Sequence, residues 1–130
     1  MIRILLVDDD DMSRGAIHKM LERAGYAVES TSDGDEVIRM YGQEAADLVI
    51  TDLIMPDKDG LEIIQDLRRL NPQVRILAIS GGGRVDANEY LAVARKFGAV
   101  EVLSKPFTKD DLRKAVDAAL GTKAPPENEA

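Results

Sequence analysis

Residues 47–60 read DLVITDLIMPDKDG, and this stretch decides how the rest of the chain is interpreted. The run from Leu48 to Thr51 is apolar enough for a buried parallel strand, and it ends on the carboxylate of Asp52. A turn rich in Pro, Asp and Gly comes next, and a helical pattern starts at Leu61. Open α/β sheets build their sites at the carboxyl ends of strands, so Asp52 is predicted to be the reactive residue.

Strand and helix patterns alternate five times along the chain. The predicted strands are residues 2–7, 26–30, 48–51, 75–80 and 100–103. Alternation at this spacing requires right-handed crossovers, which give a parallel sheet covered by helices on both faces. We therefore expect one α/β domain over residues 1–120, followed by a flexible tail over residues 121–130.

The helical segments carry apolar residues at helical spacing, which predicts the face that each helix buries. Thr108 is expected to cap the last helix in a capping box with Asp111, and Ser32 or Asp33 to cap the second. The predicted inner faces are Ile17, Met20, Leu21 and Ala24; Val37, Ile38 and Tyr41; Leu61, Ile64 and Leu67; Leu91, Ala94 and Phe97; and Leu112, Val116, Ala119 and Leu120.

The composition excludes several classes of protein. The net charge is −7, which argues against binding nucleic acid through a basic face. The chain has no cysteine and a single histidine, His18, so disulfides, thiolate metal sites and multi-histidine metal sites within this chain are excluded. No apolar run reaches membrane-spanning length and no signal-peptide pattern is present, so a cytoplasmic protein without a membrane partner is expected.

Reactive side chains follow four of the predicted strands: Asp8 and Asp9, Asp52, Ser80 and Lys105. The carboxyl ends of parallel strands lie along one edge of a sheet, so these side chains can meet in one cleft. Carboxylates packed together repel unless a cation neutralises them, and hard oxygen ligands without sulfur or imidazole favour Mg²⁺. A lysine adds a positive point charge suited to phosphate. Together these groups are suited to phosphoryl transfer to a carboxylate.

These residues carry a family resemblance. The sequences Val7-Asp8-Asp9, Asp52 with Met55-Pro56 and Gly60, Ser80, and Lys105-Pro106-Phe107 resemble those of the receiver domain of two-component response regulators. The resemblance covers residues 1–120 and implies a CheY-like, flavodoxin-like (βα)5 three-layer sandwich. Its five parallel strands would have the order 2-1-3-4-5.

The resemblance also implies a role for each acid. Asp52 would be the phosphoacceptor that attacks the phosphohistidine of a histidine kinase or a histidine phosphotransfer protein. Asp9, Asp52 and the main-chain carbonyl of Ile54 would coordinate Mg²⁺ directly, and Asp8 would hold a metal-bound water.

The remaining matched residues would contact the phosphoryl group. Lys105 would pair with it, and the bond from Lys105 to Pro106 would be cis. Ser80 would donate its hydroxyl to a phosphoryl oxygen and draw the loop after its strand inward, a local event that biases a two-state element.

The residues expected to change conformation on phosphorylation are Ser80, Gly81, Gly82, Gly83 and Val102, which we call the switch. This chain departs from the family pattern at two places in it. The family often has an aromatic residue three positions before the lysine, whereas this chain has Val102. An aromatic flip is therefore excluded. The glycine loop is also looser than is usual in the family, so ordering it should cost more entropy, and much of the response is expected there.

The lifetime of the phosphorylated state is predicted from two other positions. Ile54 and Gly82, two residues beyond Asp52 and Ser80, offer no polar side chain to orient an attacking water. A relatively long-lived acyl phosphate is expected.

Other polar residues receive plainer interpretations. Asp10 and Asp11 are expected only to cap the first helix and favour its dipole. Asp57 and Asp59 are expected in the turn. His18 lies off the apolar stripe of its helix and is expected at the surface.

The predicted function is that of a stand-alone receiver domain that signals in a phosphorelay through altered protein binding. By resemblance, the histidine partner would dock near Met12, Gly15 and Ala16 and the Pro106-Phe107 loop. A downstream target would bind the face formed by the fourth helix, the fifth strand and the fifth helix.

Two alternatives remain open. One is a Mg²⁺-dependent phosphohydrolase with an Asp nucleophile, although haloacid-dehalogenase-type enzymes carry a second acid where this chain has Ile54. The other is a pseudo-receiver, a binding module that keeps the fold without phosphorylation. The intact acid pair, Asp52 and Lys105 argue against it.

Overall fold

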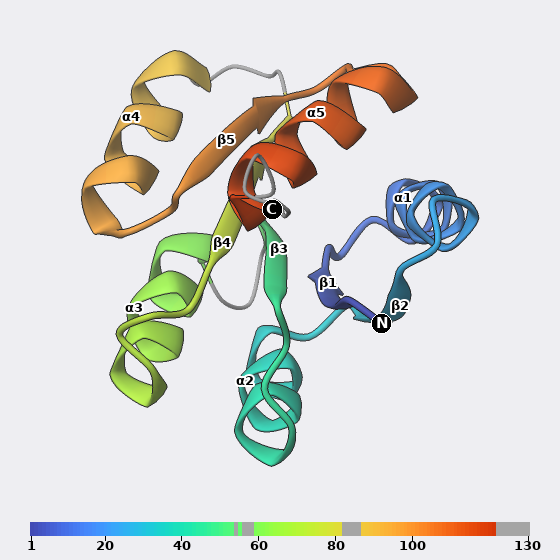
Figure 1. Cartoon of the computed structure of the whole chain (residues 1–130). Coiled ribbons are helices and arrows are strands. Elements are labelled where there is room, and N and C mark those ends of the chain that lie inside the picture. Colours follow the sequence, from blue (N-terminus) through green and yellow to red (C-terminus); the bar gives the residue numbers. More distant parts are fainter. Residues whose placement is uncertain (54, 56–58, 82–86, 122–130) are drawn as a thin grey trace.

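The computed structural model describes residues 1–53, 55, 59–81 and 87–121, and within these ranges strands and helices alternate along the chain (Figure 1). The strands are β1 (Arg3–Val7), β2 (Ala27–Thr31), β3 (Leu48–Asp52), β4 (Ile76–Ser80) and β5 (Glu101–Ser104). The helices are α1 (Asp11–Arg23), α2 (Gly34–Gln43), α3 (Gly60–Leu70), α4 (Ala87–Phe97) and α5 (Lys109–Leu120).

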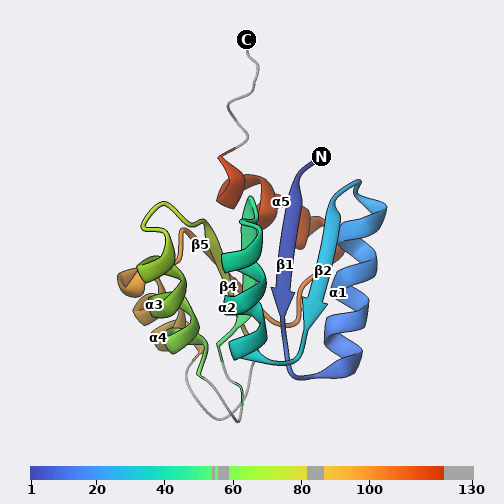
Figure 2. The same cartoon turned by 90° about the horizontal axis from the view of Figure 1, so that it is seen from below.

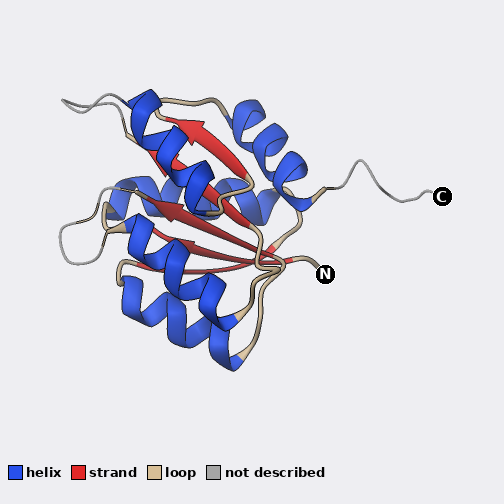
Figure 3. Ribbon diagram, turned by 90° about the vertical axis from the view of Figure 1, so that its left-hand side faces the viewer, coloured by secondary structure: helices blue, strands red, loops and turns tan. Residues whose placement is uncertain are grey.

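The five strands form one parallel sheet in the order β2-β1-β3-β4-β5, which confirms the predicted flavodoxin-like fold. Figure 3 shows the sheet as a layer between two layers of helices. In Figure 2 the arrowheads of β1 and β2 point toward the same edge. The register pairs Val7 with Thr51, Asp52 with Ile79, and Ser80 with Ser104, so the strand ends lie side by side at that edge.

The sheet is buried on both faces, which explains why its strands are continuous apolar runs. In β1, Leu5 and Val7 belong to the core under α2, α3 and α4, whereas Ile4 and Leu6 belong to the core under α1 and α5. Figures 1 and 2 show these two groups of helices on opposite sides of the sheet. Each fully buried leucine or isoleucine contributes about 1.5–3 kcal/mol to the stability of the fold relative to an exposed one. The two cores therefore hold the carboxyl ends of the strands in place.

Aspartates and a threonine begin the helices. Asp10, Asp33 and Asp59 are the N-caps of α1, α2 and α3. The side chain of Asp10 accepts from two main-chain amides of its helix, and those of Asp33 and Asp59 accept from one each. Thr108 and Asp111 form the predicted capping box of α5. The interpretation of Asp59 as a plain turn residue was therefore incomplete, because its carboxylate starts the helix that follows Asp52.

Several predicted faces and boundaries were wrong in detail. Ala24 is exposed, because α1 ends at Arg23. Ile63 is fully buried in α3, whereas Leu61 is only partly buried. Val100 is exposed because β5 starts one residue later.

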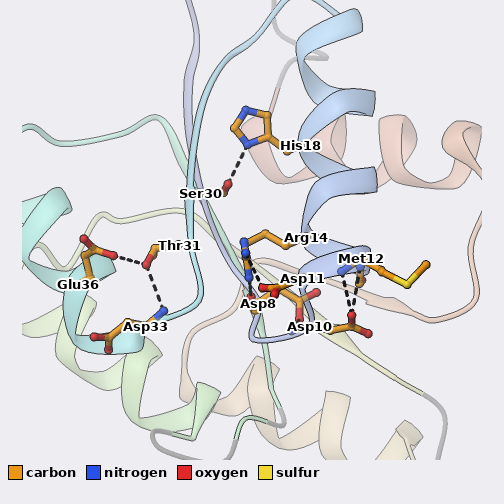
Figure 4. Close-up of polar contacts among 11 residues, drawn as sticks. Asp8, Asp10, Asp11, Met12, Arg14, His18, Ser30, Thr31, Asp33 and Glu36 are labelled. Carbon is orange, nitrogen blue, oxygen red and sulfur yellow. Dashed lines mark hydrogen bonds and ion pairs between the residues drawn. The ribbon is translucent and has the colours of Figure 1, made fainter.

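His18 lies less freely at the surface than predicted. Its Nδ1 lies 2.8 Å from the Ser30 hydroxyl, and its Nε2 lies 3.3 Å from a carboxylate oxygen of Glu22. The ring therefore packs half-buried between α1 and β2. It lies apart from the strand ends that carry the acids (Figure 4).

No helix in the described ranges is long and apolar enough to cross a lipid bilayer.

Candidate functional site

The reactive side chains predicted from the sequence lie together at the carboxyl edge of the sheet. Asp8 directly follows β1, Asp52 is the last residue of β3, and Ser80 is the last residue of β4. These three residues are buried, with exposed fractions of 2%, 8% and 0%, whereas Asp9 is exposed. Lys105 follows β5. Buried polar side chains at one sheet edge indicate a built site, because burial of such groups is costly unless they are paired.

Three carboxylates of this edge can share a cation. Oxygen atoms of Asp8, Asp9 and Asp52 all lie within 4.8 Å of one another. The donor set consists of hard oxygens, which suits Mg²⁺ rather than a softer transition metal. The residues present therefore fit the predicted ion. Ile54, whose carbonyl was predicted as a further ligand, lies outside the described residues.

Lys105 supplies the positive charge of the cluster. Its ammonium nitrogen lies 3.3 Å from Oδ2 of Asp8 and 3.5 Å from Oδ2 of Asp52. The main-chain amide of Lys105 donates to the carbonyl oxygen of Ser80 (2.8 Å), and the bond to Pro106 is cis. The hydrogen bond to Ser80 holds the main chain of Lys105 beside the end of β4, and its side chain bridges Asp8, which follows β1, and Asp52, which ends β3.

Asp8 is held from several directions. Its amide donates to the carbonyl oxygen of Thr31 (3.2 Å), which joins the end of β1 to the end of β2. Its Oδ1 accepts the amide of Asp10 (3.0 Å), while its Oδ2 faces Lys105. A buried carboxylate held by these contacts keeps its position, so it is placed to hold a water bound to a cation.

Of the predicted switch residues, the structure describes Ser80, Gly81 and Val102. The Ser80 hydroxyl donates a long hydrogen bond to the carbonyl oxygen of Gly81 (3.4 Å), and Val102 packs partly buried against the core under α2, α3 and α4. Gly82 and Gly83 lie outside the described residues, so the switch in the glycine loop stays a prediction.

Gly60 brings the start of α3 against the end of β3. Its amide donates to the carbonyl oxygen of Leu53 (3.0 Å). A methyl group at this position would lie 2.4 Å from the carbonyl oxygen of Asp52 and 2.6 Å from the Cα atom of Leu53. Only glycine allows this approach, so position 60 helps to set where the Asp52 main chain lies.

Two polar contacts near the site were not predicted from the sequence (Figure 4). Arg14 donates to the main chain of Asp8 and to Asp11, although Asp11 was assigned only to helix capping. The Thr31 hydroxyl donates to the carboxylate of Glu36. The only signal in the sequence for the first contact is the spacing of three residues between Asp11 and Arg14, which places them on one helix face.

Comparison with known proteins gives one consistent result. The family model of the response regulator receiver domain matches residues 4–117. The response regulator receiver protein CpdR of Brucella abortus is 34% identical over 120 residues, which cover 92% of this chain and 98% of CpdR. A crystal structure of a response regulator receiver domain protein from Clostridium thermocellum superposes with a TM-score of 0.85 at 30% identity, covering 95% of this chain and 97% of that one.

Other relatives are much longer. The DNA-binding transcriptional regulator NtrC of Azospirillum brasilense is 33% identical over 123 residues, which cover 95% of this chain but 25% of NtrC. The chain thus spans about a quarter of the length of that relative.

Proposed function

This chain belongs to the response regulator receiver domain family of two-component systems, and from that premise we propose that Asp52 accepts a phosphoryl group from a phosphohistidine. The donor is a histidine kinase or a histidine phosphotransfer protein. The receiver domain extends over residues 1–120 on this proposal. On this proposal the domain works in the cytoplasm.

One observation carries the proposal: a nearly buried carboxylate, Asp52, shares a pocket with two further acids and an ammonium group. Oxygens of Asp8, Asp9 and Asp52 lie within 4.8 Å of one another, and Lys105 lies 3.5 Å from Asp52. Phosphoryl transfer depends mainly on positioning and on neutralising charge, and this pocket offers both.

The residues have separate tasks in the transfer. A carboxylate oxygen of Asp52 attacks phosphorus in line with the leaving imidazole nitrogen, so a P–O bond forms as the P–N bond breaks. Asp9, Asp52 and the carbonyl of Ile54 would hold Mg²⁺ directly and Asp8 would hold it through water, and the bound ion would supply positive charge toward the phosphoryl oxygens.

Lys105 and Ser80 act on the group once it has arrived. The ammonium of Lys105 leaves its pairing with Asp52 and pairs with a phosphoryl oxygen. The Ser80 hydroxyl, whose present acceptor is a carbonyl oxygen at 3.4 Å, donates to another. A short bond to a charged oxygen is stronger than a long bond to a carbonyl, so phosphorylation favours an inward position of Ser80.

The chain is a phosphoacceptor on this account, not an enzyme acting on an external substrate. The histidine partner docks beside Met12, Gly15 and Ala16 and the Pro106-Phe107 loop. A downstream protein reads the face formed by α4, β5 and α5. The match to CpdR covers 98% of that protein, so a receiver domain of about this length occurs as a whole protein among the relatives, which is compatible with signalling by protein binding.

Labelling with a small phosphodonor tests the proposal. Acetyl phosphate with Mg²⁺ should add one phosphoryl group to the wild type, detected by intact mass, and none to Asp52→Asn. The matched control is Asp66→Asn, which removes an aspartate six residues into α3 that pairs with Arg69, and it should label like the wild type.

The same preparation distinguishes the alternatives. Sustained turnover of p-nitrophenyl phosphate would identify a phosphohydrolase instead. A wild-type protein that is folded, binds Mg²⁺ and stays unlabelled would identify a pseudo-receiver.

A further inference from the structure

Arg14 reaches back from α1 over the acidic loop, residues 8–10, and over Asp11, the first residue of α1. Its Nη1 donates to the main-chain carbonyl oxygen of Asp8 (2.8 Å), and its Nη2 donates to Oδ1 of Asp11 (2.7 Å). Figure 4 shows the guanidinium pointing toward both. Two donors from one planar group fix an orientation as well as a distance, which an ammonium group cannot do.

The carbonyl held by Arg14 belongs to the peptide unit that joins Asp8 to Asp9. Peptide units are planar, so fixing the carbonyl oxygen fixes the plane and hence the direction in which the Asp9 Cα leaves it. Asp9 is exposed, unlike Asp8, and its carboxylate must nevertheless turn toward Asp52 to share a cation. The direction of this one peptide plane therefore matters for the site.

The loop also needs an anchor, because the carboxylates it carries repel each other and Asp52. Arg14 lies one turn before Ile17, and Ile17 and Leu21 bury the same helix in the core. The Arg14 side chain itself is mostly covered, with 20% exposed. The guanidinium thus ties the acidic loop to a rigid element.

We propose that Arg14 is a positioning residue that holds the Asp8–Asp9 peptide in the orientation required for divalent-cation binding. The inference rests on the proposed function, since it concerns the same cation. Arg14 acts through Asp9 and touches neither the phosphoryl group nor the ion.

Whether Mg²⁺ binds more weakly or more tightly after Arg14 is replaced distinguishes a positioning role from a simple effect of charge. Removing a cation near an acidic site makes the local potential more negative, which by charge alone strengthens Mg²⁺ binding. Removing a positioning group has the opposite effect, because the carboxylates no longer converge. Outer partners that orient metal ligands typically change metal affinity by about 10–100-fold.

The experiment titrates Mg²⁺ into the full chain by calorimetry. We expect about tenfold weaker binding in Arg14→Gln, the lower end of that range, because the guanidinium is partly exposed. Arg14→Lys keeps the charge but loses the fork, and it should also bind more weakly than the wild type. The matched control is Arg69→Gln, which removes the same charge and a similar pair with Asp66 at 2.9 Å, also three residues apart, and it should bind Mg²⁺ like the wild type.

A second readout needs no metal. In the metal-free protein, amide hydrogen exchange at Asp9 and Asp10 should speed up in Arg14→Gln and Arg14→Lys, while the amides of β1 and β3 keep their protection.

Unchanged or tighter Mg²⁺ binding in Arg14→Gln would overturn the inference, as would full retention of affinity in Arg14→Lys. If the wild type itself bound no Mg²⁺, the proposed function would fail instead, so the two failures can be told apart.

Discussion

At the scale of single residues, Lys105 occupies the place where a cation and a phosphoryl group would also interact. Its ammonium lies 3.3 Å from Asp8 and 3.5 Å from Asp52, so in this structure it neutralises the same carboxylates that would hold Mg²⁺. The lysine and the metal therefore compete for the acids, whereas both are attracted by a phosphoryl group. The lysine is therefore expected to weaken Mg²⁺ binding and to speed phosphorylation.

Replacing Lys105 by Met should strengthen Mg²⁺ binding while slowing phosphorylation. Losing one competing charge that is mostly shielded from solvent should tighten Mg²⁺ binding by about tenfold, or ~1.4 kcal/mol. The rate of labelling by acetyl phosphate should fall, because a charge that stabilises the incoming group is missing.

Calorimetry and intact-mass kinetics measure the two effects. Lys109→Met is the matched control, because Lys109 is an exposed lysine in the first turn of α5. A Lys105→Met protein that binds Mg²⁺ more weakly than the control would contradict the competition.

At the scale of elements, the site depends on how strand ends and helix starts approach one another. The end of β3 and the start of α3 meet at Gly60, where a methyl group would lie 2.4 Å from the main-chain carbonyl oxygen of Asp52. Main chain cannot yield as a flexible side chain can, so substitution here must move either the strand end or the helix.

Gly60→Ala should destabilise the fold by ~1–3 kcal/mol, the usual cost of overpacking a filled site. Gly15→Ala is the matched control: Gly15 lies in the interior of α1 and a methyl group there would meet nothing within 4 Å. That change should stabilise by about 1 kcal/mol, because alanine favours a helix over glycine. Urea unfolding measures both, and equal stability of the two variants would show that the approach at Gly60 is not tight.

The elements were also the level at which sequence interpretation worked best. Alternating apolar runs and helical stripes predicted the parallel sheet. Because the carboxyl ends of parallel strands share one edge, the polar residues at four strand ends were expected to be able to meet in one cleft. The pattern could not distinguish Leu61 from Ile63 on α3, because both positions are apolar and the choice between them is made by packing. The strand order came from the family resemblance, since alternation alone allows several orders.

Hydrogen bonds between polar residues of different elements could not be predicted from the sequence, for a different reason. The Arg14 fork ends on a main-chain carbonyl, which every residue carries and no sequence pattern marks. His18 was assigned to the surface because it lies off the apolar stripe of its helix, and that stripe gives no sign of its partner Ser30, which lies on β2, twelve residues away. Such pairs become visible only when the elements are placed in space.

At the scale of the whole molecule, Tyr26 joins the start of β2 to α5. Its hydroxyl donates to a carboxylate oxygen of Asp117 (3.4 Å). Burial, and after it the negative charge of Asp117 and this hydrogen bond, raise the pKa of Tyr26 above its ordinary value of 10.0. The neutral phenol is therefore favoured in the folded protein.

This shift predicts how stability changes in alkaline solution. A group whose pKa is higher in the folded state stabilises the fold fully below its unfolded value, and this contribution is lost as the pH rises through the folded value. The wild type should therefore lose stability more steeply than Tyr26→Phe above pH 10.0. Urea unfolding at a series of alkaline pH values tests this. Parallel pH profiles for the two proteins would show that the Tyr26–Asp117 contact is not coupled to folding.

The whole account depends on one carboxylate accepting phosphorus beside a divalent cation and a lysine. The most direct measurement is phosphotransfer from a phosphohistidine donor in the presence of Mg²⁺, followed by borohydride reduction and sequencing of the peptides by mass spectrometry. Reduction converts a phosphorylated aspartate to homoserine, and we predict homoserine at position 52 alone, with none when Mg²⁺ is removed by chelation. Homoserine at another aspartate, or equal labelling of Asp52→Asn, would contradict the account.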